Sequence, residues 1–285
     1  MQITNTLFQM ELLQQITSAA DYITSNIANP PQVAVILGSG LGGFTEEVEI
    51  EVEINYSDIP HFPVSTVEGH TGKMIFGKLA GKQIVVLSGR FHFYEGYTPS
   101  EVVFPIRVLQ RMGIKHLLIT NAAGGTNSHF KVGDLMVIKD HISFAIVNPL
   151  LGKNLDELGT RFPDMSEPYS KKMIDMAHDI AKREGFELKE GVYFGVTGPS
   201  FETRAEYKLI QFLGADAVGM STVQEVITAV HAGMQVFAIS VITDIGVREE
   251  ENVISHKDVL EAANASAPKL TSLLMSLIES LELAS

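Results

Sequence analysis

The 285-residue sequence contains no cysteine, which excludes disulfides, thiol chemistry and cysteine-ligated metal sites together. Its nine histidines do not follow an HExxH or comparable spacing, so we expect no bound metal. No apolar run is long enough to span a bilayer. No lysine or arginine precedes Lys73, so the positively charged start of a secretory signal is missing as well. We therefore expect a cytoplasmic protein with no membrane partner.

Basic residues are few throughout the chain. Lysine and arginine number 21 against 34 acidic residues, which gives a formal net charge of −13. Such a chain repels the phosphate backbone of nucleic acids, and its basic residues form no runs, so a nucleic-acid partner is disfavoured. The hydrophobic content of 45% is ample for a large core. Without a low-complexity linker or an internal repeat, we predict a single domain over residues 1–285.

Short apolar runs predict the buried strands of an α/β fold, with a mostly buried sheet and helices around it. The clearest run, 33–37, leads directly into a glycine-rich turn. Similar runs occur at 83–87, 116–120, 134–138, 191–196 and 236–243. The segment 45–56 alternates apolar and acidic residues, which is typical of a strand with one exposed face.

Helices are predicted from apolar spacing and from capping residues. Residues 7–27 have the spacing of an amphipathic helix. Four further helix starts pair a capping Ser or Thr with an acidic or amide residue three positions later. These pairs are Thr98 with Glu101, Thr203 with Glu206, Ser221 with Gln224, and Ser255 with Asp258.

The first segment that suggests chemistry is 38–43, Gly-Ser-Gly-Leu-Gly-Gly, which fits the GxGxxG pattern of dinucleotide sites. Asp58 even lies 20 residues beyond Gly38. The strand-like segment 45–56 leaves little room for the helix that such a site requires. A loop in which backbone N–H groups and the Ser39 hydroxyl hold a small anion is the better functional interpretation. A turn that only allows tight packing is the alternative.

Arg90 and His92 directly follow another apolar run. An arginine at a strand end offers a planar fork to an oxyanion, and His92 lies on the same face if the chain stays extended. A surface ion pair and a buried core histidine would explain the same residues. The small residues of 121–127 would let a ligand approach the backbone, or would form an ordinary turn.

The remaining candidates lie near helix starts and strand ends. Phe201 could stack on a planar ligand while Glu202 accepts its N–H groups, although a carboxylate before a helix also compensates the helix dipole. Ser221 reads as a helix cap, and a helix start also favours an anion. Asp244 ends an apolar run and His256 opens the last helix. An aspartate at such a place is often only a turn residue.

The order of the segments is more specific than any one of them. The motifs Gly-Ser-Gly-Leu-Gly-Gly, Gly-His-Thr-Gly, Gly-Arg-Phe-His-Phe-Tyr-Glu-Gly-Tyr, Asn-Ala-Ala-Gly-Gly, Gly-Pro-Ser-Phe-Glu-Thr and Gly-Met-Ser-Thr-Val follow one another. In this order, from about Val33 to the last helix, the chain resembles the trimeric purine nucleoside phosphorylases. The resemblance implies a central mixed β-sheet, partly barrel-like and surrounded by helices. It also implies a homotrimer that uses inorganic phosphate as co-substrate and no metal or organic cofactor.

The resemblance also implies roles for individual residues. The phosphate would be held by Ser39, His70, Arg90, His92, Ser221 and the backbone of Ala122. The nucleoside would contact Tyr94, Ala123, Gly124, Phe201, Glu202, Val218, Met220, Asp244 and His256, with Phe162 supplied by the neighbouring subunit. The residues expected to take part most directly in the reaction are His92, Glu202 and Asp244.

Asp244 departs from the commonest pattern of this family, which has asparagine there. An ionised aspartate only accepts hydrogen bonds and therefore suits a 6-amino group better than a 6-oxo group, while a protonated one can donate. We expect a site that handles inosine and guanosine and also tolerates adenosine. A methylthioadenosine phosphorylase and a non-catalytic nucleoside-binding protein are the alternatives. The phosphate-holding residues and Glu202 favour the nucleoside phosphorylase.

Overall fold

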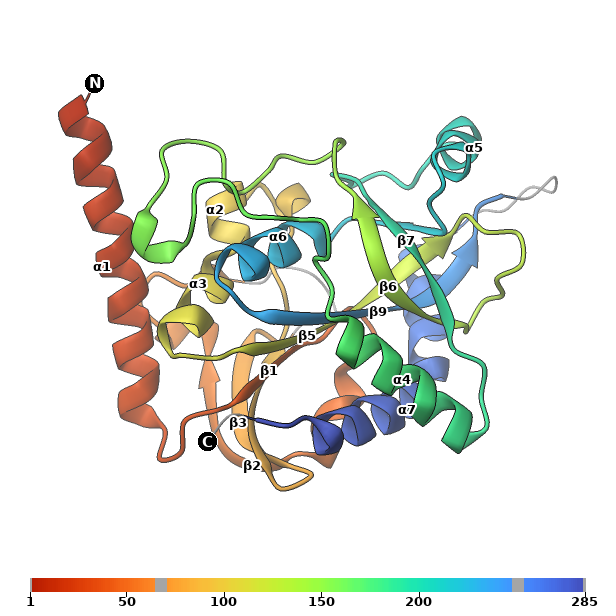
Figure 1. The fold of residues 1–285 in the computed structure, drawn as a ribbon, viewed down its shortest axis with the longest axis horizontal. Coiled ribbons are helices and arrows are strands. Elements are labelled where there is room, and N and C mark those ends of the chain that lie inside the picture. The colour runs from red at the N-terminus through yellow and green to blue at the C-terminus, as the bar shows by residue number, and fades with distance from the viewer. Residues whose placement is uncertain (1, 65–70, 248–253, 284–285) are drawn as a thin grey trace.

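The computed structural model describes residues 2–64, 71–247 and 254–283. A twisted β-sheet runs through the middle of the molecule, and helices cover it on several sides (Figure 1). The long helix α1 (Gln2–Asn26) packs on α3 (Phe104–Arg111), which in turn packs on α6 (Val223–His231). Elsewhere α4 (Lys171–Glu184) packs on α7 (His256–Ser280), and α7 also contacts the sheet.

Nine strands form the sheet, in the order β2-β3-β4-β1-β5-β8-β7-β6-β9. They are β1 (Val33–Ile36), β2 (Glu49–Asn55), β3 (Lys73–Leu79), β4 (Lys82–Ser88), β5 (His116–Gly125), β6 (Leu135–Ile142), β7 (Lys189–Gly195), β8 (Ala217–Gly219) and β9 (Gln235–Ile245). Strand β9 also pairs in parallel with β5, so that β5, β8, β7, β6 and β9 close into a ring. The mixed, partly barrel-like sheet surrounded by helices is thereby confirmed.

Strand β5 is longer than the sequence pattern predicts. We expected the strand to stop near Thr120, but it runs on to Gly125 because β9 and β8 supply hydrogen-bond partners along the extension. Small residues are needed there: a Cβ atom on Gly125 would lie 2.7 Å from the Ile245 side chain. The small-residue segment is therefore part of the sheet, and the ordinary-turn interpretation is wrong.

Three of the four predicted helix starts are confirmed. Capping boxes begin α2 (Pro99–Val102), α5 (Arg204–Phe212) and α7 at Thr98, Thr203 and Ser255. The prediction for Ser221 is wrong, because Thr222 precedes α6 and its N–H donates to the Glu225 carboxylate at 2.9 Å. Ser221 instead accepts a hydrogen bond from Arg90 at 3.2 Å. This leaves Ser221 one residue outside the helix, turned towards the predicted phosphate site.

The dinucleotide interpretation of the glycine-rich segment has no support in the structure. The residues after it form a short 3₁₀ helix, η1 (Gly42–Glu47), and then enter β2. A dinucleotide site needs a full helix with its N-terminus at the glycine turn. Asp58 accepts hydrogen bonds from the Asn55 side chain at 2.9 Å and from the Ser57 hydroxyl at 3.4 Å.

The strand β2 forms one end of the sheet order. It carries Glu49, Glu51 and Glu53 at alternate positions, all exposed, and pairs with β3 alone among the described strands. The predicted strand is confirmed over Glu49–Asn55, but a β-bulge between Ile50 and Val52 interrupts the alternation and Ile50 is exposed.

Candidate active site

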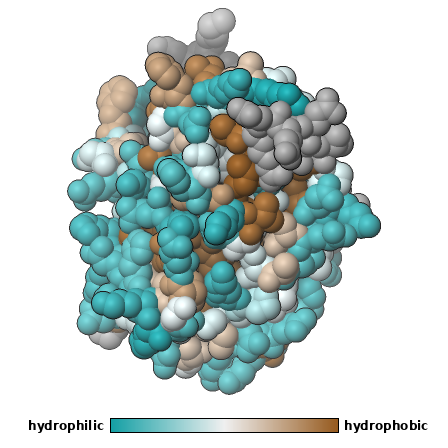
Figure 2. All heavy atoms as spheres, turned by 90° about the vertical axis from the view of Figure 1, so that its right-hand side faces the viewer, coloured by the Kyte–Doolittle hydropathy of each residue, from teal (hydrophilic) through white to brown (hydrophobic). Residues whose placement is uncertain are grey.

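The predicted site residues meet at one cavity. A hollow of about 670 Å³, partly open to solvent, lies where β5, β8 and β9 approach the loops after β1 and β4. Fourteen of the sixteen predicted residues line it: Ser39, Arg90, His92, Tyr94, Ala122, Ala123, Gly124, Phe201, Glu202, Val218, Met220, Ser221, Asp244 and His256. Figure 2 shows the side of the molecule that carries α5 and the end of β9, where apolar surface gathers in a hollow among hydrophilic residues.

Two predicted residues stand apart from this cavity. His70 lies outside the described residues. Phe162 is 83% exposed and lines a different hollow, with the Arg161 guanidinium 5.4 Å from its ring centre. Its separation from the cavity of its own chain leaves open the expected contribution to a neighbouring subunit.

The glycine-rich loop places Ser39 at the cavity by packing directly on β5. The Gly38 N–H donates to the Thr120 hydroxyl at 2.9 Å. A Cβ atom on Gly38 would lie 2.7 Å from the Asn121 Cα atom, so only glycine permits this approach. The turn therefore serves tight packing and also brings the Ser39 hydroxyl to the cavity wall.

Arg90 is fixed by a buried ion pair that the sequence analysis did not anticipate. Its Nε and one terminal nitrogen donate to the two carboxylate oxygens of Glu225, at 3.2 and 3.0 Å. The other terminal nitrogen donates to the Thr120 carbonyl at 2.9 Å and to the Ser221 hydroxyl at 3.2 Å. Four contacts of this kind hold the planar guanidinium in one orientation at the cavity wall.

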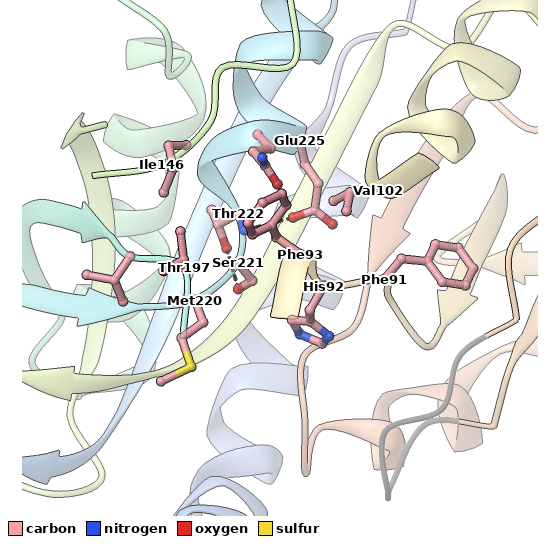
Figure 3. A pocket seen from close by; sticks show the side chains of 12 residues that line it. Phe91, His92, Phe93, Val102, Ile146, Thr197, Met220, Ser221, Thr222 and Glu225 are labelled. Carbon is pink, nitrogen blue, oxygen red and sulfur yellow. Dashed lines mark hydrogen bonds between the residues drawn. The ribbon is translucent and has the colours of Figure 1, made fainter. Parts of the chain in front are cut away.

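A smaller hollow of about 370 Å³ adjoins this ion pair, and Figure 3 shows His92, Ser221 and Glu225 around it. Glu225 comes from the first turn of α6, three residues after Thr222. That Thr-x-x-Glu spacing is the signal by which the sequence could have revealed Glu225, as a capping-box residue.

His92 is oriented by Glu95, and the two form a capping box. The Glu95 carboxylate accepts from the His92 backbone N–H at 2.8 Å and lies 3.0 Å from its Nδ1. Because a carboxylate accepts, the proton of the neutral ring lies on Nδ1. The ring also stacks on Tyr94, with ring centres 4.6 Å apart. Burial lowers the pKa of His92, and the hydrogen bond to Glu95 opposes that decrease.

Two carboxyl groups, those of Glu202 and Asp244, line the same cavity together with Tyr207. The Tyr207 hydroxyl donates to Asp244 Oδ2 at 3.1 Å, and the Thr243 hydroxyl donates to Oδ1 at 3.2 Å. Burial raises the pKa of Glu202, hydrogen bonding with Tyr207 opposes that rise, and the charge of Asp244 adds to it. Sequence reasoning missed Tyr207 because its place in α5 gives only the apolar signal of a helix interior.

Comparison with known proteins accounts for this arrangement. The sequence profile of the phosphorylase superfamily matches residues 32–279. The chain is 50% identical to purine nucleoside phosphorylase 1 of Geobacillus stearothermophilus over 246 residues, 86% of this chain and 90% of that protein. The chain belongs to the purine nucleoside phosphorylase family. The resemblance inferred from the order of the motifs is thereby confirmed.

Solved structures of this family have the same fold. Structures of Schistosoma mansoni purine nucleoside phosphorylase, one in complex with adenosine and one with inosine, each give a TM-score of 0.91 at 38% identity. Each match covers 95% of this chain and 98% of the other.

Within residues 2–64, 71–247 and 254–283, no group of three or more His, Asp or Glu side chains could hold a metal ion. Over the same described ranges, no helix combines the length and apolarity needed to cross a membrane.

Proposed function

We propose that this cavity holds inorganic phosphate and a purine nucleoside side by side and cleaves the N-glycosidic bond by reversible phosphorolysis. The chain acts on purine nucleosides, as its family does, and releases the free base with ribose or deoxyribose 1-phosphate. The observation that carries the proposal is the arrangement of one cavity with Arg90, His92 and Ser221 at one end and Phe201, Glu202 and Asp244 lining the same space.

At the phosphate end, the fixed guanidinium of Arg90 supplies charge and direction. Ser39, His92, Ser221 and the Ala122 backbone line the same cavity and bring further polar groups to the phosphate. As the glycosidic bond breaks, positive charge develops on the ribose. The bound phosphate stabilises that charge and then attacks the anomeric carbon. Holding the two reactants in this orientation contributes several kcal/mol to lowering the barrier, about 7 or more in well-oriented cases.

At the base end, the purine leaves more readily when its N7 is protonated, and Asp244 is placed to accept a hydrogen bond from N7–H. Phe201 stacks on the ring, while Glu202 faces N1. Tyr94, Met220 and His256 contact the ribose between the two ends. Because the reacting groups come from phosphate, nucleoside and side chains, the proposed reaction needs neither a metal nor an organic cofactor.

We further propose a cytoplasmic homotrimer in which Phe162 completes the site of a neighbouring subunit. Support comes from its position: the ring is exposed and lies away from the cavity of its own chain. An exposed phenylalanine is suited to cover a ligand across an interface.

The identity of residue 244 bears on the choice of base. An ionised Asp244 accepts from both N7–H and a 6-amino group, whereas asparagine donates to a 6-oxo group while accepting from N7–H. The S. mansoni relative has been solved with adenosine and with inosine. We therefore propose that this enzyme uses adenosine in addition to inosine and guanosine.

The test measures purine release from inosine, guanosine and adenosine, with and without phosphate, for the wild type and for Asp244→Asn. We expect release only with phosphate, and a lower ratio of adenosine to inosine turnover in the variant. Equal release without phosphate would mean hydrolysis, and no release would leave only nucleoside binding. If the wild type ignored adenosine and the substitution changed nothing, Asp244 would not determine specificity.

A further inference from the structure

Glu202, Tyr207 and Asp244 form a short chain of hydrogen-bonding groups at the base end of the cavity. Tyr207 lies between the two carboxyl groups in this chain. Its hydroxyl donates to Asp244 Oδ2 at 3.1 Å, and its interaction with the Glu202 carboxyl group affects the pKa values of both residues. All three residues line the cavity.

The position of Tyr207 is set by two glycines. A Cβ atom on Gly246 would lie 2.0 Å from its ring, and one on Gly124 would lie 2.9 Å from its hydroxyl oxygen. The ring thus occupies space that any other residue at Gly246 would fill. The hydroxyl is held beside Asp244 by packing, and not by the hydrogen bond alone.

Towards the two carboxyl groups of Glu202 and Asp244, a purine base presents one of two opposite hydrogen-bonding patterns. A 6-aminopurine has an acceptor at N1 and a donor at its amino group. A 6-oxopurine has a donor at N1–H and an acceptor at its oxygen. With Glu202 facing N1 and Asp244 facing the 6-substituent, the first edge needs a protonated Glu202 and an ionised Asp244. The second edge needs an ionised Glu202 and a protonated Asp244. In both complexes the two carboxyl groups together carry one proton.

We propose that Glu202 and Asp244 share one proton through Tyr207, and that its position determines whether the site recognises a 6-aminopurine or a 6-oxopurine. This inference rests on the proposed function, which places the base against these carboxyl groups. In the 6-aminopurine form, Glu202 holds the proton and Tyr207 donates to Asp244. In the other form, the Glu202 proton has passed to the Tyr207 oxygen and the Tyr207 proton to Asp244. Charge and proton number are the same in both forms.

The surroundings favour a single shared proton. Two carboxylates in one buried space repel each other, so one of them holds a proton more readily than in water. Burial and the charge of Asp244 both raise the pKa of Glu202. Burial and the two carboxyl groups also raise the pKa of Tyr207 far above its ordinary value, so it stays neutral. The other ionisable groups nearby are Glu206, which adds negative charge, Tyr193, and His256 on the cavity wall.

The test compares kcat/KM for adenosine and inosine, at saturating phosphate, between about pH 5 and pH 8. For the wild type we expect both nucleosides to react and their pH profiles to coincide, because both complexes carry the same number of protons. For Tyr207→Phe we expect the ratio of adenosine to inosine kcat/KM to fall about tenfold. Adenosine loses more because the Tyr207 hydroxyl donates to Asp244 at 3.1 Å, so we expect it to stabilise an ionised Asp244, which adenosine requires, more than the ionised Glu202 that inosine requires.

The matched control is Tyr169→Phe, which removes another buried hydroxyl, one that contacts His141 Nδ1 at 2.9 Å and does not line this cavity. It should leave the ratio unchanged. If Tyr207→Phe lowers the melting temperature, equilibrium binding of adenine and hypoxanthine below that temperature gives the same ratio.

The outcomes separate the inference from the proposed function. Three outcomes would overturn the shared proton and leave phosphorolysis standing. These are wild-type pH profiles that differ between the two nucleosides, a wild type inactive towards adenosine, and an equal loss of kcat/KM for both nucleosides in Tyr207→Phe. Absence of phosphate-dependent release from every nucleoside would overturn both.

Discussion

The carboxylate of Glu225 aligns the guanidinium of Arg90 through two nitrogen–oxygen contacts, and the two side chains are only 6% and 2% exposed. The pair joins the first turn of α6 to the loop after β4, segments 135 residues apart in the chain. A buried charge pair with this geometry fixes direction more than it adds stability, since desolvation offsets much of the attraction.

Glu225→Gln is therefore expected to lower kcat about tenfold, because a misdirected guanidinium loses part of the orientation that favours reaction. The KM for phosphate should change less, since Arg90 keeps its charge. The free energy of unfolding should fall by about 3–5 kcal/mol, because the amide has only one acceptor oxygen and leaves the buried Arg90 charge uncompensated. Steady-state kinetics and urea denaturation measure these effects. Glu53→Gln, which breaks an exposed ion pair with Lys73, is the control. An unchanged kcat would exclude the positioning role.

Glu95→Gln should shift the titration of His92 to lower pH. Burial already lowers the pKa of His92, and the Glu95 carboxylate opposes this by favouring the charged ring. A neutral amide keeps the hydrogen-bonding oxygen but not the charge, so the pKa falls further. Imidazole proton shifts in NMR, assigned with His92→Gln, follow the titration. Glu101→Gln, at the exposed cap of α2, should leave it unchanged. A midpoint that moves upward would contradict the proposed electrostatics.

Phe162 can be tested by combining two defective subunits. Phe162→Ala should raise the nucleoside KM, and Glu202→Ala should disable the base end of the subunit that carries it. In mixed trimers, Phe162 of a Glu202→Ala subunit completes the intact cavity of a Phe162→Ala subunit. Coexpression should then give more activity than the two variants assayed separately. No gain would mean that Phe162 does not act across an interface.

Light scattering should give a mass of three chains of 31.1 kDa for the wild type and for both variants. Phe212→Ala is the matched control, because this phenylalanine is 86% exposed on α5. It should leave the nucleoside KM unchanged.

His231 should make the protein less stable in acid. Burial, with the charge of Arg107 adding to it, lowers its pKa to about 4. The unfolded chain has the ordinary value near 6.5 and so binds more protons as the pH falls. The free energy of unfolding is therefore unaffected by His231 above about pH 6.5. Between pH 6.5 and pH 4 it falls by on the order of 3 kcal/mol, because the unfolded chain takes up the proton first.

Urea denaturation between pH 7 and pH 4 measures this loss. His231→Gln should remove most of the pH dependence in that range, and His129→Gln, on the surface, should preserve it. A loss of the same size in His231→Gln would assign the acid sensitivity to other groups.

Most strands and helix starts could be predicted because their signals are local. The run at Val33 and the capping boxes at Thr98 and Thr203 each depend on a few neighbouring residues. Strands β3 and β8 were not predicted. Strand β8 has three residues and owes its conformation to pairing with β5 and β7. Ring closure likewise depends on contacts between distant segments, and only the resemblance to a family indicated it.

The same distinction applies to the candidate site. The motif order singled out Arg90 and Asp244, which directly follow or end apolar runs. Glu225 and Tyr207, which hold those two residues, lie inside helices where the local pattern indicates only capping or packing. Partners of this kind become visible when tertiary contacts bring them to the residue that they orient.

The position of β2 at the edge of the sheet has a consequence for aggregation. A sheet edge with open backbone groups invites pairing with another molecule. Among the described strands, ring closure occupies β9 on both sides and leaves β2 with one strand partner. Glu51 and Glu53 of this strand form ion pairs with Lys78 and Lys73, and a β-bulge between Ile50 and Val52 interrupts the ladder. Charged side chains and a bulge are both features that oppose pairing of one sheet edge with another, so this edge works against fibrous aggregation.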